Sequence, residues 1–498
     1  MPEVILPASF VALLFEFRPA FTEPSFHNFL LLCAGFLHSV GKHRITNALR
    51  AAGLGSDKHY SCFYRFFSKA SWSLDEIGLL LLALVLRFFP SVVVELVLDD
   101  TLIRRTGKKV ALASMHADPL LQRGRQAFHS YGHVFVILTV HVSCPQLGLT
   151  GWALPFLFRL YESPKQGGRK DSPSDSRRAL SRRKANKGQR QRRRMTDHEV
   201  VKGKLSRCKK KPDPGPLPKK VLPTKLQLAA EMVQLVAKRF PTVRFRVLAD
   251  HLYCGKELLH TVHSTIKTAS FVTRGRPDAA LYTLPPPKDG HQRGQPRVRG
   301  ARLDSPVKWA EANGGKFEEV VVGIYGHQVP MLLGSYVGMP YRSLPGRLVR
   351  YVISRDPEGI YKDDYILSTD PDLSPREIIE AFSRRWPLER TFQECKQKLG
   401  VQDGQTQLPE SVRRVAPMQM VLYSLVVLWY LLDGHRQASL LPEYRDPWYT
   451  NLGRPSFSEM LATLRRVSWA EALSDPSSGG TTCSEILAAY IARVVAPA

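Results

Sequence analysis

The residues best suited to chemistry lie in one stretch, FSRRWPLERTFQECK, at positions 382–396. At 100° per residue on an α-helix, four of its side chains fall within about 60° of one another: Phe382, Arg385, Glu389 and Lys396. A carboxylate binds a hard divalent cation, and the arginine and lysine beside it bind phosphate oxygens. The stretch therefore predicts a reaction on a nucleic-acid backbone. Taken alone, it is also typical of a solvated helix face with ordinary ion pairs.

Two other segments place acids at the ends of predicted strands. The run VVVELVLDDT (92–101) is rich in β-formers and reaches Asp99 and Asp100 near its end, while VRFRVLAD (243–250) ends at Asp250. A single aspartate in such a place is more often a turn former. Acids on two strands and a later helix can, however, converge on two divalent cations about 3.5–4 Å apart, which clamp both oxygens of an in-line phosphoryl displacement.

The intervening sequence predicts the elements that would hold these acids in place. We expect a hairpin of two strands (133–142 and 148–156), an amphipathic helix (225–240), a short helix (255–264) and a strand (267–274). Residues 275–370 are rich in Gly and Pro with short β-like runs, which is typical of a β-rich insertion. Ser374 as N-cap, Pro375 and the capping-box Glu377 then predict the start of a helix.

The N-terminal 90 residues have the pattern of helices. One amphipathic helix is expected over 42–52 and a second from Ser56 as N-cap, with Arg44, Lys58 and Arg65 among the basic residues on them. This arrangement fits a helix-turn-helix-like DNA reader, and it fits a plain helical bundle equally well.

Composition limits the partners of the chain. The 498 residues carry a formal net charge of +27, and 21 Lys or Arg against 5 Asp or Glu lie between residues 165 and 220. This segment is also rich in Ser, Gly and Pro, so we expect it to be disordered without a partner. Such basicity indicates a polyanion, which is nucleic acid or an anionic membrane surface.

Membrane attachment, disulfides and zinc ribbons are disfavoured. The longest apolar runs, 77–86 and 420–432, are shorter than the roughly 18–20 residues that span a bilayer. The N-terminus lacks the layout of a signal peptide, and the seven cysteines include no CxxC pair. We therefore expect a reduced, cytoplasmic compartment and association with the nucleoid.

Residues 80–435 resemble bacterial insertion-sequence transposases of the DDE type in three motifs. LVLDDT is similar to the first-strand motif, whose Asp-x-Thr spacing selects Asp99 over Asp100, and VLADHLYCGKELL resembles the second motif and selects Asp250. The Tyr-x2-Arg-x3-Glu-x6-Lys signature falls on the four residues of the first stretch, followed by the family-like KQKLGVQDGQT.

The resemblance implies an α/β fold in which an RNase H-like mixed sheet is flanked by helices. The expected parts are a helical, DNA-binding domain (1–90), the first part of the catalytic core (91–274) with its basic loop (162–223), a β-strand insertion domain (275–370), the core with the Glu helix (371–435) and a C-terminal helical region (436–498).

The function implied is metal-dependent DNA strand cleavage and strand transfer. Asp99, Asp250 and Glu389 would be catalytic and would bind two Mg²⁺ or Mn²⁺ ions. DNA-binding side chains would be Arg385, Lys396, Phe382, Trp386, Arg44, Lys58 and Arg65. The partners would be double-stranded DNA, as element ends and target, and a second copy of the chain. A catalytically inactive DNA-binding derivative and a hydrolytic nuclease of the same fold remain alternatives.

Two departures from the family pattern affect the DNA-binding residues. Phe382 stands where the family has Tyr, so a hydroxyl is missing. Pro387 lies between Arg385 and Glu389 and restricts Trp386, so we expect the helix to kink or restart at residue 387.

Overall fold

The computed structural model describes residues 5–53, 58–107, 109–122, 128–145, 149–163, 222–262, 266, 268–287, 295, 297–324, 326–360, 362–440 and 455–474. The basic segment 165–220 and Ser56 lie outside these ranges, and what the sequence predicts for them stays a prediction. Contacts divide the chain into two units, 1–113 with 131–161 and 223–498, and 114–130 with 162–222. The smaller unit contains strand β2 (Ser114–Ala117) and one 3₁₀ turn, η2 (Pro119–Leu121).

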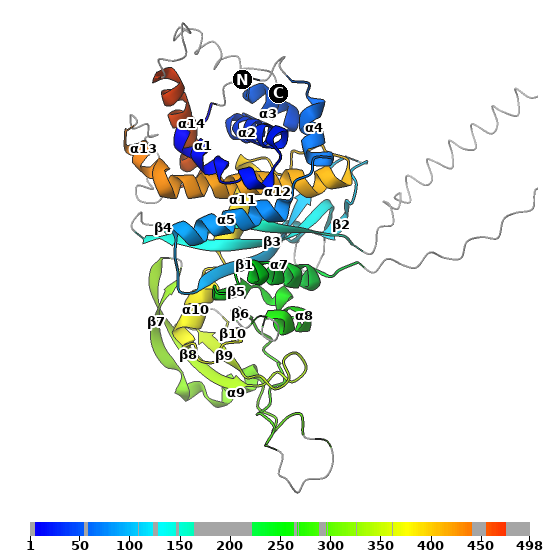
Figure 1. The fold of residues 1–498 in the computed structure, drawn as a ribbon. Helices are drawn as coiled ribbons and strands as arrows, with labels where there is room; N and C mark the ends of the chain where they lie inside the picture. The colour runs from blue at the N-terminus through cyan, green and yellow to red at the C-terminus, as the bar shows by residue number, and fades with distance from the viewer. Residues whose placement is uncertain are drawn as a thin grey trace, which may run out of the picture. The chain divides into compact units, whose positions relative to one another are not determined.

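A mixed sheet runs through the larger unit (Figure 1). Its strand order is β4-β3-β1-β5-β6-β10-β9-β8-β7. The bounds are β1 Val94–Arg104, β3 His129–Cys144, β4 Leu149–Tyr161, β5 Phe245–Ala249, β6 Ala269–Arg274, β7 Glu318–Ile324, β8 His327–Gly338, β9 Val349–Arg355 and β10 Asp364–Ser368. Neighbours are antiparallel except in the pairs β1–β5 and β5–β6, which are parallel.

The first five strands form an RNase H-like sheet, as the sequence predicted. Strands β4, β3 and β1 make an antiparallel meander, and β5 and β6 continue it in parallel with β1. The first half of β1 is buried because it lies between two neighbours in the middle of the sheet, which explains its nearly continuous apolar sequence. The predicted hairpin is the pair β3–β4.

The β-like runs between the second aspartate and the glutamate do not form a sheet of their own. Strand β10 pairs with β6, and β9, β8 and β7 follow in antiparallel order. The segment therefore extends the same sheet beyond its fifth strand.

Helices cover the sheet and form a further layer over it (Figure 1). Their bounds are α1 Ala8–Phe15, α2 Glu23–His38, α3 Ile45–Ala51, α4 Ser61–Ser68, α5 Leu74–Phe88, α7 Lys225–Arg239, α8 Lys256–His260, α9 Pro306–Ala312, α10 Pro375–Ser383, α11 Pro387–Lys398, α12 Pro409–Trp429, α13 His435–Leu440 and α14 Phe457–Ser474. Short turns are η1 Arg18–Ala20, η4 His251–Tyr253, η6 Gly314–Lys316 and the π-helical η7 Tyr430–Gly434.

Helices α5, α7, α11 and α12 pack on β4. Helix α10 packs on β5, β6, β10, β9, β8 and β7. Helix α5 comes so close to β4 that a Cβ on Gly78 would lie 1.9 Å from the carbonyl oxygen of Phe156. A glycine is required there because the two backbones leave no room for a side chain.

Of the helices before α5, α1, α2 and α4 pack against α12, and α3 packs against α2. With η7 and α13, α12 forms a helix of 30 residues, Pro409–Ala438, that is long and apolar enough to cross a membrane. However, 94% of its most apolar window is buried inside the protein. The apolar run 420–432 is thus one part of a longer helix, and this helix belongs to the protein core.

The stretch 382–396 is not one continuous helix. Helix α10 begins with the predicted capping box of Ser374 and Glu377 and ends at Ser383, and α11 begins at Pro387. A single face shared by Phe382, Arg385 and the later residues is therefore wrong, because proline interrupts the helical hydrogen bonding. The restart at residue 387 is as the sequence predicted.

Candidate active site where β1 and β5 part

Asp99 and Asp250 lie side by side where the pairing of β1 with β5 ends. The parallel register pairs Leu98 on β1 with Ala249 on β5, so the next residue on each strand is an aspartate. Asp250 follows β5 directly and precedes the 3₁₀ turn η4. Its Oδ1 is buried and makes no hydrogen bond within the described part of the chain. An orphaned carboxylate oxygen beside a second carboxylate is a site of unbalanced negative charge.

Asp100 is engaged elsewhere, because successive residues of a strand point to opposite faces. Its Oδ2 accepts a hydrogen bond from Nζ of Lys225 at 2.8 Å, and its Oδ1 accepts one from the hydroxyl of Tyr253 at 3.0 Å. The sequence reasoning missed both partners, although Tyr253 lies within the second motif.

The carboxyl of Asp99 titrates far from its ordinary range. Burial raises its pKa to about 7, the neighbouring Asp100 adds to the rise, and the charge of Asp250 contributes less. A hydrogen bond from its neighbour's backbone N–H and the positive charge of Arg385 oppose the shift. The direction shows that ionising this carboxyl is costly unless a cation balances it.

Arg385 links the strand aspartate to the helix glutamate. Its guanidinium lies 3.5 Å from Oδ2 of Asp99 and 3.4 Å from Oε1 of Glu389, and its side chain is only 13% exposed. The ring of Phe382 lies between two arginines, with the guanidinium carbons of Arg274 and Arg385 each 5.7 Å from its centroid. Arg385 thus brings the predicted glutamate into the neighbourhood of the predicted aspartates.

Helix α11 directs Glu389 away from the core. Thr391, on the opposite face, donates a hydrogen bond to the carbonyl oxygen of Ala153 on β4 and is fully buried. Glu389 lies in the first turn of the helix and is 46% exposed. Lys396, seven residues later, lies on the same face as Glu389, because seven residues are almost two full turns.

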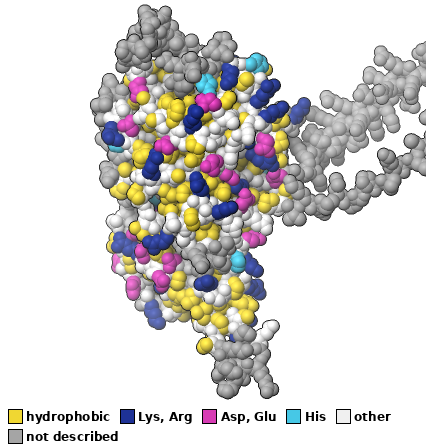
Figure 2. Space-filling view, in the orientation of Figure 1, with side chains coloured by type: hydrophobic (Ala, Val, Ile, Leu, Met, Phe, Trp, Pro, Cys, Tyr) yellow, Lys and Arg dark blue, Asp and Glu magenta, His cyan; other side chains and the backbone are white. Residues whose placement is uncertain are grey.

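The remaining predicted DNA-binding residues belong to two parts of the fold. Trp386, in the junction between α10 and α11, is 51% exposed. Arg44, Lys58 and Arg65 belong to the N-terminal helical layer: Arg44 caps α3, Lys58 donates to Asn28, and Arg65 is exposed on α4. On the face that Figure 2 shows, Lys and Arg side chains are interspersed with Asp and Glu, so no single basic patch marks a DNA path there.

The aspartate pair fits a divalent cation. Two carboxylates at one sheet edge, one with an orphaned oxygen and one with a raised pKa, match the hard oxygen ligands that Mg²⁺ and Mn²⁺ prefer. Among the described residues, no group of three or more His, Cys, Asp or Glu side chains already stands in a metal-binding arrangement. In this structure Glu389 is paired with Arg385 instead.

Family comparisons agree with this geometry. Residues 16–321, more than half of the chain, match a family described as DDE superfamily endonuclease. The chain belongs to this family. Residues 224–421 also match a family described as transposase DDE domain, so the protein is an endonuclease of the DDE transposase type. DDE endonucleases usually use divalent metals.

Two further comparisons add little. No curated protein matches the chain. A cryo-EM structure of the piggyBac transposase synaptic complex with hairpin DNA is similar with a TM-score of 0.39 and 10% identity, over 95% of this chain and 76% of that one. This similarity is too low to support a conclusion.

The raised pKa predicts how metal-free stability depends on pH. Between about pH 4 and 7 the folded state keeps the Asp99 proton that the unfolded chain releases, so this group's contribution to the free energy of unfolding falls as pH rises. Asp99→Asn should remove that part, which we expect to be roughly 2–4 kcal/mol over this range. Urea denaturation of both proteins in EDTA measures it. Parallel pH profiles would show that Asp99 does not titrate as described.

Proposed function

We propose that this chain is the DNA transposase of a bacterial insertion sequence, which binds the ends of the element and catalyses strand cleavage and strand transfer. The observation that carries the proposal is the emergence of Asp99 and Asp250 side by side from adjacent parallel strands, with Glu389 tied to Asp99 through Arg385. The family match, which shows that the chain is a DDE superfamily endonuclease, supports the proposal.

In this proposal, Asp99, Asp250 and Glu389 form the DDE triad and hold two Mg²⁺ or Mn²⁺ ions. Bound ions of this kind polarise the scissile phosphate and lower the pKa of an attacking water. The two aspartates come from rigid strands, whose ends fix the spacing of their carboxylates. Glu389 comes from the first turn of α11 and would exchange Arg385 for the metal as its partner.

The DNA-binding residues follow from the same geometry. Arg385 contacts two carboxylates at 3.4–3.5 Å, which is long for charged partners, so a phosphate can compete for its guanidinium. Together with Lys396 it completes the Tyr-Arg-Glu-Lys signature in which Phe382 replaces Tyr. The half-exposed Trp386 can stack on a base, and Arg44, Lys58 and Arg65 are proposed to contact the element ends. Pairing of two ends implies a homodimer on DNA.

The triad can be tested with substitutions that keep side-chain size. Asp99→Asn, Asp250→Asn and Glu389→Gln should each lower the cleavage rate by about a thousandfold, because several kcal/mol of transition-state stabilisation is lost. Asp100→Asn is the matched control, since its partners Lys225 and Tyr253 lie outside the triad. Gel assays with DNA carrying the element ends and Mg²⁺ measure cleavage and binding separately. Loss of cleavage in Asp100→Asn with full activity in Asp99→Asn would overturn the assignment.

Lys396 can be compared with Lys398 on the same helix. Replacing either lysine with alanine removes one positive charge. Lys398, however, lies nine residues from Glu389, on the opposite face of α11. Lys396→Ala should reduce the slope of log affinity against log salt for element-end DNA by about one unit, because one phosphate contact is lost. Lys398→Ala should leave the slope unchanged. Equal slopes in both variants would assign Lys396 to another role.

A further inference from the structure

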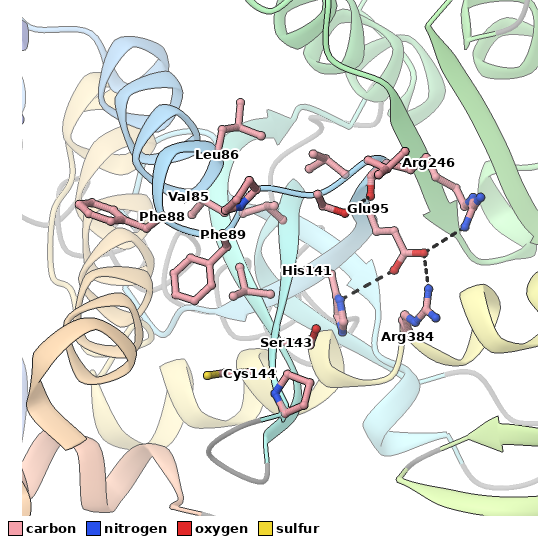
Figure 3. Close-up of a pocket in the computed structure, with 18 residues that line it drawn as sticks. Val85, Leu86, Phe88, Phe89, Glu95, His141, Ser143, Cys144, Arg246 and Arg384 are labelled. Atoms are coloured by element: carbon pink, nitrogen blue, oxygen red, sulfur yellow. Dashed lines mark hydrogen bonds and ion pairs between the residues drawn. The ribbon is translucent and has the colours of Figure 1, made fainter. Parts of the chain in front are cut away.

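A second charged cluster lies near the other end of β1. Figure 3 shows Glu95 with three basic side chains directed toward it, from β3, β5 and the residue that follows α10. The Glu95 carboxylate accepts hydrogen bonds from Arg384 at 2.5 Å and Arg246 at 3.3 Å, and Nδ1 of His141 lies 3.8 Å away. Glu95 is buried, with 8% of its surface exposed. Glu95 is a charged residue in an otherwise apolar run, VVVELVL, and this sequence signal could have pointed to the cluster.

The balance of charge leaves Glu95 with two cations. Burial and the nearby Arg384 lower the pKa of His141 to about 4, so the imidazole is neutral at pH 7. One carboxylate therefore faces two guanidinium groups. The cluster borders a cavity of about 960 Å³, whose other walls include Phe88 and Phe89 at the end of α5. Arg384 is 38% exposed, whereas Arg246 is 13% exposed.

Arg246 and Arg384 connect Glu95 to different parts of the fold. Arg246 lies on β5, which is paired with β1. In that pairing Arg246 is the register partner of Glu95. Arg384 is the residue that caps α10, in the junction that leads to α11. Its contact with Glu95 is therefore a link between the junction and the sheet, and the Arg246 contact is a link within the sheet.

Consecutive arginines of the junction reach two acids on one face of β1. Glu95 and Asp99 are four residues apart, so both side chains point to the same face, about 13 Å from each other along the strand. Arg384 contacts the first and Arg385 the second. The junction is thus held at two points over the strand that carries a proposed metal ligand.

We propose that Glu95 and Arg384 form a positioning pair that fixes the α10–α11 junction, and with it Arg385 and the first turn of α11, over β1. The inference deepens the proposed function and rests on it for the role of Glu389. If the cluster only neutralised Glu95, Arg246 and Arg384 would be equivalent. As a positioning pair, only Arg384 controls the geometry of the glutamate.

The experiment compares Arg384→Ala with Arg246→Ala in the full-length chain. Each variant removes one cation from the same carboxylate, so both should lower the melting temperature. Only Arg384→Ala should speed amide hydrogen exchange in residues 384–389, whose backbone N–H groups at 384, 385, 386, 388 and 389 are hydrogen-bonded within the junction. Arg384→Lys should restore much of the protection. Equal exchange in the two alanine variants, or faster exchange in Arg246→Ala alone, overturns the pair.

Calorimetry with Mn²⁺ alone gives a readout that a purely structural role would not move. Arg384→Ala should weaken Mn²⁺ binding by about 10–100-fold, the range for residues that orient a metal ligand, and Arg246→Ala should stay near the parent value. If the parent binds Mn²⁺ and both variants bind equally well, the positioning role is wrong. If the parent binds none, the proposed metal site fails, and hydrogen exchange still decides whether the junction is held by this pair.

Discussion

The crowding of negative charge where the pairing of β1 with β5 ends determines much of this structure. Parallel pairing makes Asp99 and Asp250 neighbours, and Asp100 follows at once. Burial disfavours the ionised form of Asp99 and raises its pKa to about 7. The three aspartates differ in the groups that contact them. Lys225 and Tyr253 bind Asp100, and Arg385 lies beside Asp99. One oxygen of Asp250 has no hydrogen-bond partner among the described residues. A divalent cation, as proposed above, would balance this charge.

The helices around the sheet bring a third carboxylate to that edge from far along the sequence. Strands β7 to β10 extend the sheet between the second aspartate and α10, so the chain returns to β1 after about 130 residues. The packing of α10 on the added strands and the anchoring of Thr391 on β4 hold the two helices on either side of a short junction. Glu95 and Arg384 connect that junction to β1, which relates the helix geometry to the strand that carries Asp99.

Sequence patterns were sufficient for the parts that depend on local structure. Alternation and apolar runs located β1, the hairpin, α7 and β5, and proline chemistry located the break at Pro387. The spacing of Asp-x-Thr selected Asp99, and the structure adds a physical distinction, because Asp100 points to the other face and has its own partners. The prediction of one helix face for Phe382 and Glu389 was wrong, since a broken helix places residues by tertiary packing. The pairing of Glu95 with Arg384 joins residues 289 positions apart, and no local pattern encodes it.

The most direct measurement is anomalous diffraction from crystals of the full-length protein bound to element-end DNA and Mn²⁺. The account predicts an anomalous peak about 2.1 Å from carboxylate oxygens of both Asp99 and Asp250, with Glu389 turned from Arg385 toward the metal site and a phosphate beside the arginine. A peak at Asp100, or an ordered complex with no metal between Asp99 and Asp250, would contradict it.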